Sequence, residues 1–396
     1  MNRKIIITDT AVREKDVRLA CLVSESRLLE VRCERSDAES ILGNIYVGRV
    51  QKIVKSIRAA FIEIAPGKAC YYPLKENSAP VFVKKIPSPG LVQGDELLVQ
   101  VQKEDVKTKA PTVTTNLNLT GRYVVLTSEN KKIGFSSKLG KEQKEHLRNL
   151  VEKCYEEDFG LILRTNAGNA SEDEVVSEIR WLSSRMSGMI SKADMRTCFS
   201  CIYQASPKYM SYLQNSYQEG LSEIVTDLPE VFSEMKEYCR QYPALEQIPL
   251  RLYEDKLLPL SKLYNLERQM ERALAKNVWL KSGGYLVIEP TEAMTVIDVN
   301  TGKSVAKKDP RRHFLEINLE AAEEIACQLR LRNISGIIII DFIDLDSEKD
   351  RRTVMQRLRS SVKGDSVPVQ VLDMTKLNLV EVTRKKIEKT LSEQLG

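Results

Sequence analysis

The fold is decided by YLVIEP (285–290), MTVIDVN (294–300), GIIIIDF (336–342) and VPVQVLDM (367–374), four apolar stretches that predict strands. Helical periodicity at about 315–332 and 347–363 separates the last three of them. The continuous apolar run from Ile337 to Ile340 indicates a strand that is buried on both faces. Strands that alternate with helices in this way predict a βαβαβ unit with a parallel sheet and right-handed crossovers.

Two aspartates close consecutive strands of this unit. Asp298 follows MTVI and Asp341 follows GIIII, so parallel neighbours would present both carboxylates at the carboxyl edge of the sheet, where open α/β sheets bind ligands. Side chains alternate along a strand, so Asn300 shares the face of Asp298. Two acids and one amide form a hard oxygen site that suits Mg²⁺. Such an ion lowers the pKa of a bound water and so generates a nucleophile for a phosphoryl group.

A structural interpretation of these acids stays open at this point. In that interpretation one of them caps a helix or begins a turn, as we expect for Asp346 immediately before SEKDRRTVMQRL. Basic residues near the same edge suit a phosphodiester backbone. The basic run 384–386, however, is better interpreted as the solvated face of a C-terminal helix. Pattern alone therefore does not decide between a metal pair and a structural role.

The rest of the chain predicts three further regions. Short alternating strands begin the sequence, and several short strands separated by turns at about 40–118 predict a small β-barrel. Strands at 121–127 and 160–165, with helices between and after them, predict a small α/β module. Helical spacing follows at 209–240 and 262–276.

Composition and charge exclude several classes of protein. The chain has 396 residues, of which 42% are hydrophobic and 29% charged, a composition typical of globular rather than disordered proteins. It contains no apolar run long enough to span a membrane, and its first residues do not form a signal peptide, so we expect a cytoplasmic protein. The net charge of +5 does not by itself indicate a nucleic-acid partner.

Cysteine and histidine chemistry is not indicated. Cys198 and Cys201 form a CxxC, but no second pair completes a tetrahedral zinc site, and CFSCIY (198–203) is better interpreted as a buried strand. The two histidines, His146 and His313, lie in polar segments and are expected at the surface. A mechanism that needs two imidazoles is therefore disfavoured.

Longer motifs resemble the ribonuclease E/G family, and the similarity extends over almost the whole chain. The motifs similar to its catalytic signatures are TEAMTVIDVN (291–300), INLEAAEEIACQLRLRNISGIIIIDFIDL (317–345) and TKLNLVEVTRKK (375–386). GNIYVGRVQKIVKSIRAAFIEIAPGKACYYPLKE (43–76) resembles the S1 barrel of the family, and GLILRTNAG (160–168) resembles its 5′-monophosphate pocket.

The resemblance implies an α/β multidomain protein. In this architecture an RNase H-like part is interrupted by an S1 domain, which is an OB-type β-barrel, and by a small α/β 5′-sensor module. A DNase I-like α/β catalytic domain follows. The implied boundaries are 1–37 and 209–278 for the RNase H-like segments, 38–118 for the S1 barrel, 119–208 for the sensor module and 279–396 for the catalytic domain.

The resemblance also assigns roles to individual residues. Asp298 and Asp341 would hold Mg²⁺ and Asn300 would orient one of them, which makes these three the expected catalytic residues. The residues expected to contact RNA elsewhere are Phe61, Tyr71 and Lys109 in the barrel and Val125, Arg164 and Thr165 around a 5′-monophosphate. Without the resemblance, Phe61 is interpreted equally well as an exposed ring or as a residue of the barrel core. The alternative for Val125 is a core residue, and for Arg164 a surface arginine at a strand end.

The implied activity is that of a Mg²⁺-dependent endoribonuclease that cleaves single-stranded, A/U-rich RNA. It would leave 5′-phosphate and 3′-hydroxyl ends, prefer 5′-monophosphorylated RNA, and act in RNA turnover and ribosomal RNA maturation. The alternatives are a non-catalytic RNA-binding protein that keeps the barrel and a nuclease that acts on DNA. The presence of both aspartates favours catalysis, and the S1-like barrel favours RNA over DNA.

Two departures from the family pattern bear on these expectations. No cysteine follows Cys327 to form the family's zinc-sharing segment, so we expect no zinc and leave a homodimer open. Asn378 stands where the family usually has glycine, and asparagine tolerates a positive φ better than most residues.

Overall fold

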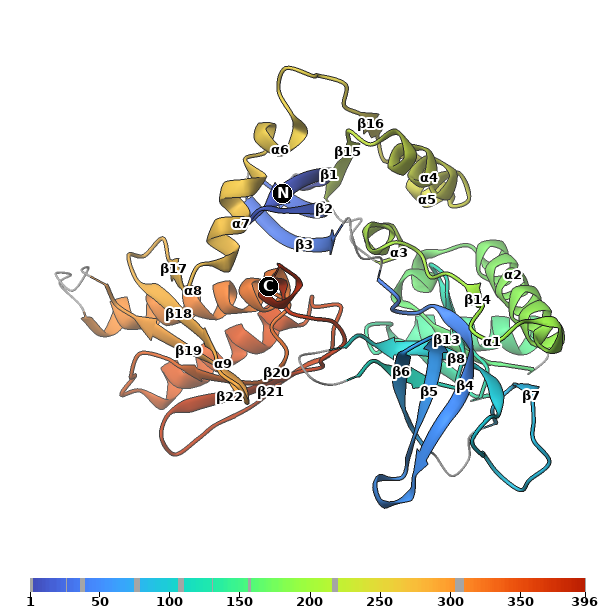
Figure 1. Ribbon diagram of the computed structural model, residues 1–396. Coiled ribbons are helices and arrows are strands. Elements are labelled where there is room, and N and C mark those ends of the chain that lie inside the picture. The colour runs from blue at the N-terminus through green and yellow to red at the C-terminus, as the bar shows by residue number, and fades with distance from the viewer. Residues whose placement is uncertain are drawn as a thin grey trace. The chain divides into compact units, whose positions relative to one another are not determined.

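The computed structural model describes residues 3–25, 27–35, 40–74, 79–105, 110–129, 131–155, 158–215, 220–302 and 310–395. They form two compact units (Figure 1). Unit 1 comprises Met1–Ala38, Gly220–Glu237 and Gln247–Gly396, and unit 2 comprises Glu39–Glu219 and Tyr238–Glu246. This division is coarser than the five segments expected from the sequence, whose boundaries stay a prediction.

The first sheet of unit 1 has the strand order β16-β15-β1-β2-β3. Its strands are β1 (Arg3–Val12), β2 (Lys15–Ser24), β3 (Arg27–Arg35), β15 (Leu221–Thr226) and β16 (Leu250–Leu252). The helices that follow β15 and β16 along the chain are α4 (Pro229–Arg240), α5 (Pro243–Glu246), α6 (Leu260–Leu263) and α7 (Leu266–Leu274). β1 is parallel to β15 and antiparallel to β2. Apolar side chains of β1, β2 and β3 pack against α7.

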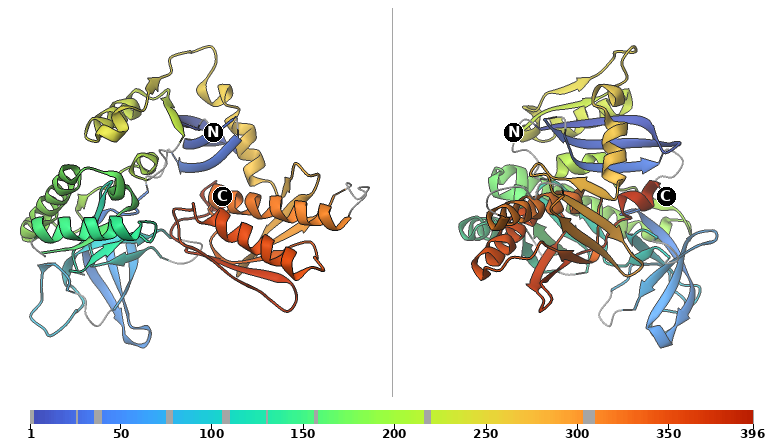
Figure 2. Two further views of the ribbon diagram at one scale, coloured as in Figure 1. Left: turned by 180° about the vertical axis from the view of Figure 1, so that it is seen from behind. Right: turned by 90° about the vertical axis from the view of Figure 1, so that its left-hand side faces the viewer.

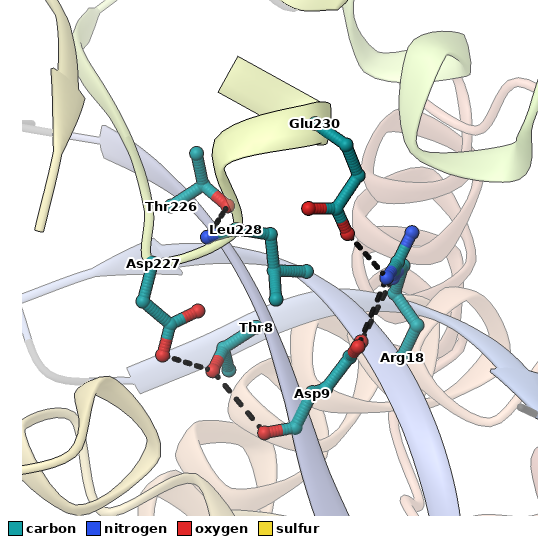
Figure 3. A network of polar contacts seen from close by, with 7 residues as sticks. All are labelled: Thr8, Asp9, Arg18, Thr226, Asp227, Leu228 and Glu230. Atoms are coloured by element: carbon teal, nitrogen blue, oxygen red, sulfur yellow. Dashed lines mark hydrogen bonds and ion pairs between the residues drawn. The ribbon is translucent and has the colours of Figure 1, made fainter. Parts of the chain in front are cut away.

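A polar network ties this sheet to the start of α4 (Figure 3). Arg18 on β2 donates two hydrogen bonds to the carboxylate of Asp9, at 2.8 and 2.9 Å, and a third to Glu230 at 2.9 Å. The hydroxyl of Thr8 donates to Asp227 at 2.8 Å, directly after β15. The guanidinium of Arg18 therefore compensates two of the three carboxylates gathered here.

The second sheet of unit 1 has the order β17-β18-β19-β20-β22-β21. Its strands are β17 (Asn277–Trp279), β18 (Tyr285–Pro290), β19 (Met294–Asn300), β20 (Gly336–Asp341), β21 (Val369–Met374) and β22 (Leu379–Arg384). The helices are α8 (Pro310–Leu331), α9 (Glu348–Val362) and α10 (Leu391–Leu395). Alternate residues of the central strands are buried against α8 and α9, which cover one face (Figure 2). The residues between them are partly exposed on the opposite face, called the open face below. Ile337 is 49% exposed, so β20 is buried on one face and not on both as the sequence predicted, because helices cover only one side of the sheet.

The predicted βαβαβ unit is correct for its first crossover and wrong for its last strand. β19 and β20 are parallel neighbours joined by α8. β21, however, pairs antiparallel with β22, which lies between β20 and β21. Arg384 is the last residue of β22; it is buried and pairs with Asp365 at 2.9 Å. The run that begins there is thus not a solvated helix face, because its first residue belongs to an inner strand.

Unit 2 contains the predicted small β-barrel, which is confirmed. Its strands are β4 (Ile45–Val54), β5 (Ala59–Ala65), β6 (Lys68–Pro73), β8 (Glu96–Lys103) and β9 (Thr112–Thr114), with β7 (Phe82–Lys84) and β14 (Cys201–Tyr203) at its edges. β4 pairs with both β5 and β8, so the sheet β4-β5-β6-β9-β8 closes on itself. Ile62, Cys70, Tyr72 and Val99 fill the interior, which leaves the alternate residues outside.

The other sheet of unit 2 forms the predicted α/β module. Its order is β10-β11-β13-β12. The elements are β10 (Asn118–Thr120), β11 (Val124–Thr127), β12 (Ile133–Phe135), β13 (Gly160–Leu163), α1 (Lys141–Cys154), α2 (Glu172–Ser191) and α3 (Ser211–Gln214). The buried carboxylate of Glu178 accepts hydrogen bonds of 2.7–2.8 Å from the N–H groups of Arg122, Tyr123 and Val124. A side chain at Gly121 would collide with this carboxylate, so glycine is required there.

Two local expectations are corrected. The segment 209–240, predicted to be helical throughout, contains strand β15 between α3 and α4. In CFSCIY only Cys201–Tyr203 forms a strand, and Cys201 is exposed rather than buried because β14 lies at the margin of the barrel sheet. Among the helices in the described ranges, none is sufficiently long and apolar to cross a membrane.

Candidate functional site

The two aspartates selected from the sequence face each other across adjacent strands. Asp298 on β19 and Asp341 on β20 are register partners in the parallel pair, as the sequence predicts. The side-chain amide of Asn300 donates a hydrogen bond of 2.7 Å to Oδ2 of Asp298. All three side chains lie on the open face, because their sequence neighbours Ile297, Val299 and Ile340 are buried beneath α8 and α9.

The electrostatics of this pair favour a cation. Partial burial of its carboxyl group, together with the negative charges of Asp298 and Asp344, raises the pKa of Asp341 above its ordinary value. In the part of the chain that the structure describes, no lysine or arginine forms an ion pair with Asp298 or Asp341. A bound cation would relieve the repulsion between the two carboxylates.

The loops beside the pair are held by asparagines. Asn318 on α8 is completely buried, donates to the carbonyl of Ile343 at 2.7 Å and accepts from its N–H at 3.1 Å. This fixes the loop that follows Asp341. Asn378 adopts a φ of 62° and donates to Asp344 at 3.2 Å. The expectation that asparagine adopts a positive φ at this position is confirmed.

The donor set fits Mg²⁺. The described residues contain no cluster of three histidine, cysteine or acidic side chains suited to a metal. Mg²⁺ nevertheless is usually bound by one or two carboxylates and keeps several waters. Asp298 and Asp341 supply two carboxylates on an exposed face, with Asn300 orienting one of them. The candidate metal ligands are therefore Asp298 and Asp341.

A basic hollow of about 560 Å³ lies beside this edge of the sheet. Its lining includes Arg351, Arg352 and Arg359 of α9, together with Lys376 and Asn378. It also includes two acids, of which Glu348 pairs with Arg352 and Asp373 with Arg359. Asn378 also contacts Asp344, so the hollow adjoins the loop after Asp341. A sequence pattern does not select the three arginines, since a helix with several charges is usually a solvated face.

The barrel presents two of its three predicted RNA-binding residues together on its outer surface. Phe61 and Tyr71 are register partners on β5 and β6, with ring centroids 6.2 Å apart. Both are partly exposed, so Phe61 is not a core residue. Exposed Lys52 on β4 pairs with Phe61 in the same row; the bulge between Val50 and Lys52 hides this alignment from a count of residues. Lys109 lies outside the described residues.

The three predicted sensor residues lie around one end of the β11–β13 pair. Val125 pairs with Ile162 and is half-buried. Thr165 exchanges a hydrogen bond of 2.9 Å with Ser136. Arg164 is largely buried, and burial lowers its pKa. Its guanidinium is not directed to open solvent.

The partners of Arg164 belong mainly to the end of α3. It donates to the carbonyl of Gln214 at 3.2 Å and to Oδ1 of Asn215 at 2.6 Å, in addition to the carbonyl of Gly121. Asn166 also donates to Gln214, at 3.1 Å. A phosphate at this place would share Arg164 with α3.

Two further expectations for polar residues are wrong. His313 is 2% exposed, because α8 begins at Pro310 and places this residue in its buried part. His146, in contrast, is exposed as expected and lies 3.4 Å from Glu172. Asp346 does not cap α9; the hydroxyl of Ser347 accepts from the N–H of Asp350 instead.

Fold and site together define a class: an α/β protein of two compact units, with a closed five-stranded barrel in one and a carboxylate pair suited to a divalent cation in the other. The chain belongs to the ribonuclease E/G family, whose model matches residues 118–387. It is 34% identical to ribonuclease G of Haemophilus influenzae over an alignment of 395 residues, which covers 97% of this chain and 80% of that protein.

Two further relatives show the same relationship. Ribonuclease G of Escherichia coli K12 is 32% identical over 379 residues, covering 93% of this chain and 77% of that protein. Ribonuclease E of the same strain is 31% identical over 407 residues, covering 99% of this chain and 38% of that protein.

Proposed function

We propose that this chain is a Mg²⁺-dependent endoribonuclease that cleaves single-stranded, A/U-rich RNA and leaves 5′-phosphate and 3′-hydroxyl ends. The observation that carries the proposal is the register pairing of Asp298 with Asp341 on the open face. Membership of the family and the names of its relatives support RNA as the substrate. We further propose action in RNA turnover and ribosomal RNA maturation in the cytoplasm, as a possible homodimer.

Each residue of the site is proposed to have a separate role. Asp298 and Asp341 would hold the ion, which supplies a Lewis acid and an acidified water when bound. Asn300 fixes the carboxylate of Asp298 through its hydrogen bond, since partners of metal ligands set their orientation. In the basic hollow, Arg351 and Lys376 would provide positive charge for the phosphate backbone, since Arg352 and Arg359 pair with acids there.

The barrel would bind the single strand through its outer surface. Phe61 and Tyr71 offer two partly exposed rings in one row, and bases stack on such rings without strict sequence preference. Lys52, next to Phe61 in that row, and Lys109 would bind phosphates.

The 5′-monophosphate preference is proposed to depend on Arg164, Thr165 and Val125. Arg164→Ala should reduce the preference for monophosphorylated over 5′-hydroxyl RNA and leave cleavage of the 5′-hydroxyl RNA largely intact. Because Arg164 also holds the end of α3, Asn215→Ala is the matched control: it removes one contact of Arg164 and keeps the guanidinium. Equal loss on both substrates would refute the sensor role.

The test of the activity is cleavage of a short single-stranded A/U-rich RNA, with Mg²⁺ or EDTA, by the wild type, Asp298→Asn and Asp9→Asn. Internal cuts should vanish with EDTA and fall by on the order of 10²–10³-fold in Asp298→Asn, whereas Asp9→Asn, an aspartate neutralised within the first sheet, should still cleave. RNA binding without cleavage by the wild type would instead support the non-catalytic RNA-binding protein.

A further inference from the structure

An exposed pair of aromatic rings lies on the same sheet as the carboxylates. Trp279 on β17 is 71% exposed, and its ring lies 5.0 Å from that of Tyr285 on β18, at an angle of 46°. The two rings together form an exposed aromatic surface on β17 and β18. The fold itself does not need this ring, since its neighbour Val278 is the residue of β17 that packs against the core.

The register of the sheet connects these rings to the candidate site. Trp279 pairs with Tyr285, and Tyr285 pairs with Asn300, so the three residues form one row across β17, β18 and β19. The next row on this face contains Asp298 and Asp341. Neighbouring strands are about 4.8 Å apart, so Trp279 lies about 10 Å from Asn300 along the row.

The hairpin that carries the rings is fixed against the end of β19. Glu320 of α8 accepts hydrogen bonds from the N–H groups of Lys281 and Ser282, at 2.6 and 2.9 Å. A Cβ at Gly284 would lie 2.7 Å from the carbonyl oxygen of Asn300, so the turn approaches β19 as closely as backbone can. The backbone that carries the rings is therefore fixed relative to Asn300.

We propose that Trp279 and Tyr285 form a nucleobase subsite, on which a base of the RNA strand stacks while a phosphate of the same strand lies at Asp298 and Asp341. The occupant is a base because the surface is aromatic and in register with a phosphodiester site, and every base has a face that stacks on a ring. Exposed Lys281, two residues after Trp279, adds positive charge for the backbone of that strand.

This inference rests on the proposed function, because it assumes that the RNA strand cleaved at Asp298 and Asp341 is the same RNA strand whose base stacks on Trp279 and Tyr285. Its kinetic signature differs from that of a catalytic group. A stacking contact away from the reacting phosphate contributes mainly to substrate binding. Trp279→Ala should raise KM about tenfold, equivalent to about 1.4 kcal/mol at 25 °C, and change kcat less than about twofold.

Fluorescence gives a readout independent of cleavage. The chain has two tryptophans, Trp181 and Trp279, so Trp181→Phe leaves Trp279 as the single reporter in the full chain. Trp181 lies on α2 in unit 2 and is also exposed. In Trp279→Phe it is the single tryptophan, so its fluorescence serves as the control for effects of RNA that do not come from stacking at position 279. An A/U-rich RNA decamer, added with EDTA so that it is not cleaved, should quench Trp279 in a saturable manner and leave Trp181 unchanged.

The outcomes separate the inference from the activity. Cleavage by the wild type with an unchanged KM in Trp279→Ala and no quenching of Trp279 would overturn the subsite and leave the nuclease intact. A KM that rises in Trp279→Ala and recovers in Trp279→Phe supports the subsite.

If the wild type does not cleave RNA, the proposed activity fails, and quenching of Trp279 by the decamer alone decides whether the subsite exists. A Trp279 signal that changes with protein concentration but not with RNA would assign the rings to a contact between copies and overturn it.

Discussion

Unit 1 contains two sets of carboxylates, each beside a pair of parallel strands, and only one of the two sets is paired with a cation of the chain. In the first sheet, Asp9 on β1 is paired with Arg18, and Asp227 after β15 accepts from Thr8 (Figure 3). In the second sheet, Asp298 and Asp341 face each other and are oriented by an amide rather than neutralised by a cation. In the first set, Arg18 of the same chain balances the charge of Asp9. The second leaves its negative charge for a ligand.

This difference indicates that strand-end acids alone do not mark a metal site. Arg18 contacts both Asp9 and Glu230, so the first set stabilises the junction of β2 with α4. Removing a charge there should cost stability. Removing one from the second set should cost activity rather than stability, because it removes a candidate ligand of the cation and at the same time relieves the repulsion at Asp341.

The largest effect is expected for Asp341→Asn. Cleavage should fall by on the order of 10²–10³-fold, while the free energy of unfolding measured without Mg²⁺ stays unchanged or rises, because one of the charges that oppose Asp298 and Asp344 is removed. Urea denaturation and the cleavage assay provide both values. A loss of stability with cleavage intact would assign Asp341 to the structural class of Asp9.

The next effect concerns the hydrogen bonds that orient each set. Asn300→Ala should lower kcat by about 10–100-fold, since partners of metal ligands typically contribute that much. Thr8→Val removes the corresponding hydrogen bond to Asp227 and should leave kcat unchanged. Equal losses in the two variants would contradict the distinction between the sets.

A smaller effect is expected for Arg18→Met, which leaves Asp9 and Glu230 uncompensated. All three side chains are partly exposed, so water screens the pair and the expected loss of stability is about 0.5–1 kcal/mol. Arg312→Met, which removes an exposed pair with Glu316, should cost less. Both variants should cleave like the wild type per folded molecule; a cleavage defect confined to Arg18→Met would show that the first set serves the reaction.

The smallest expected effect is a change in the pH dependence of the free energy of unfolding when Asp227 is replaced. Burial, reinforced by the charge of Asp9, raises the pKa of Asp227 above the ordinary aspartate value of 3.8. The folded state then binds the proton more tightly than the unfolded state, so this group's contribution to stability falls as pH rises from 3.8 through the folded pKa. Unfolding free energies across that range should decline less steeply for Asp227→Asn than for the wild type. Asp346→Asn, at an exposed aspartate, should follow the wild type, and parallel curves for all three proteins would refute the shift.

The features that the sequence predicted correctly are those that depend on residues close together in the chain. Asp298, Asn300 and Asp341 were selected by strand ends and alternation, and their shared face is confirmed by the register and by the hydrogen bond. The barrel strands were recognised for the same reason: short alternating stretches separated by turns. The roles of these residues in catalysis and RNA binding stay predictions that the experiments above test.

What the sequence did not predict depends on pairing at long range. The insertion of β22 between β20 and β21 joins segments that no local pattern connects, and it buries Arg384 with Asp365. Strand β15 was taken for helix, because its register is set by β1, more than 200 residues earlier in the chain. The alignment of Lys52 with Phe61 needs the bulge in β4.

The most direct test of the central claim is metal binding itself. Mn²⁺ replaces Mg²⁺ at oxygen sites and its free concentration is measured by electron paramagnetic resonance. The wild type and Asp9→Asn/Asp227→Asn should bind Mn²⁺ alike, and Asp298→Asn/Asp341→Asn should lose that binding while remaining folded. If the first double variant loses Mn²⁺ and the second retains it, the assignment of the open carboxylate pair is wrong.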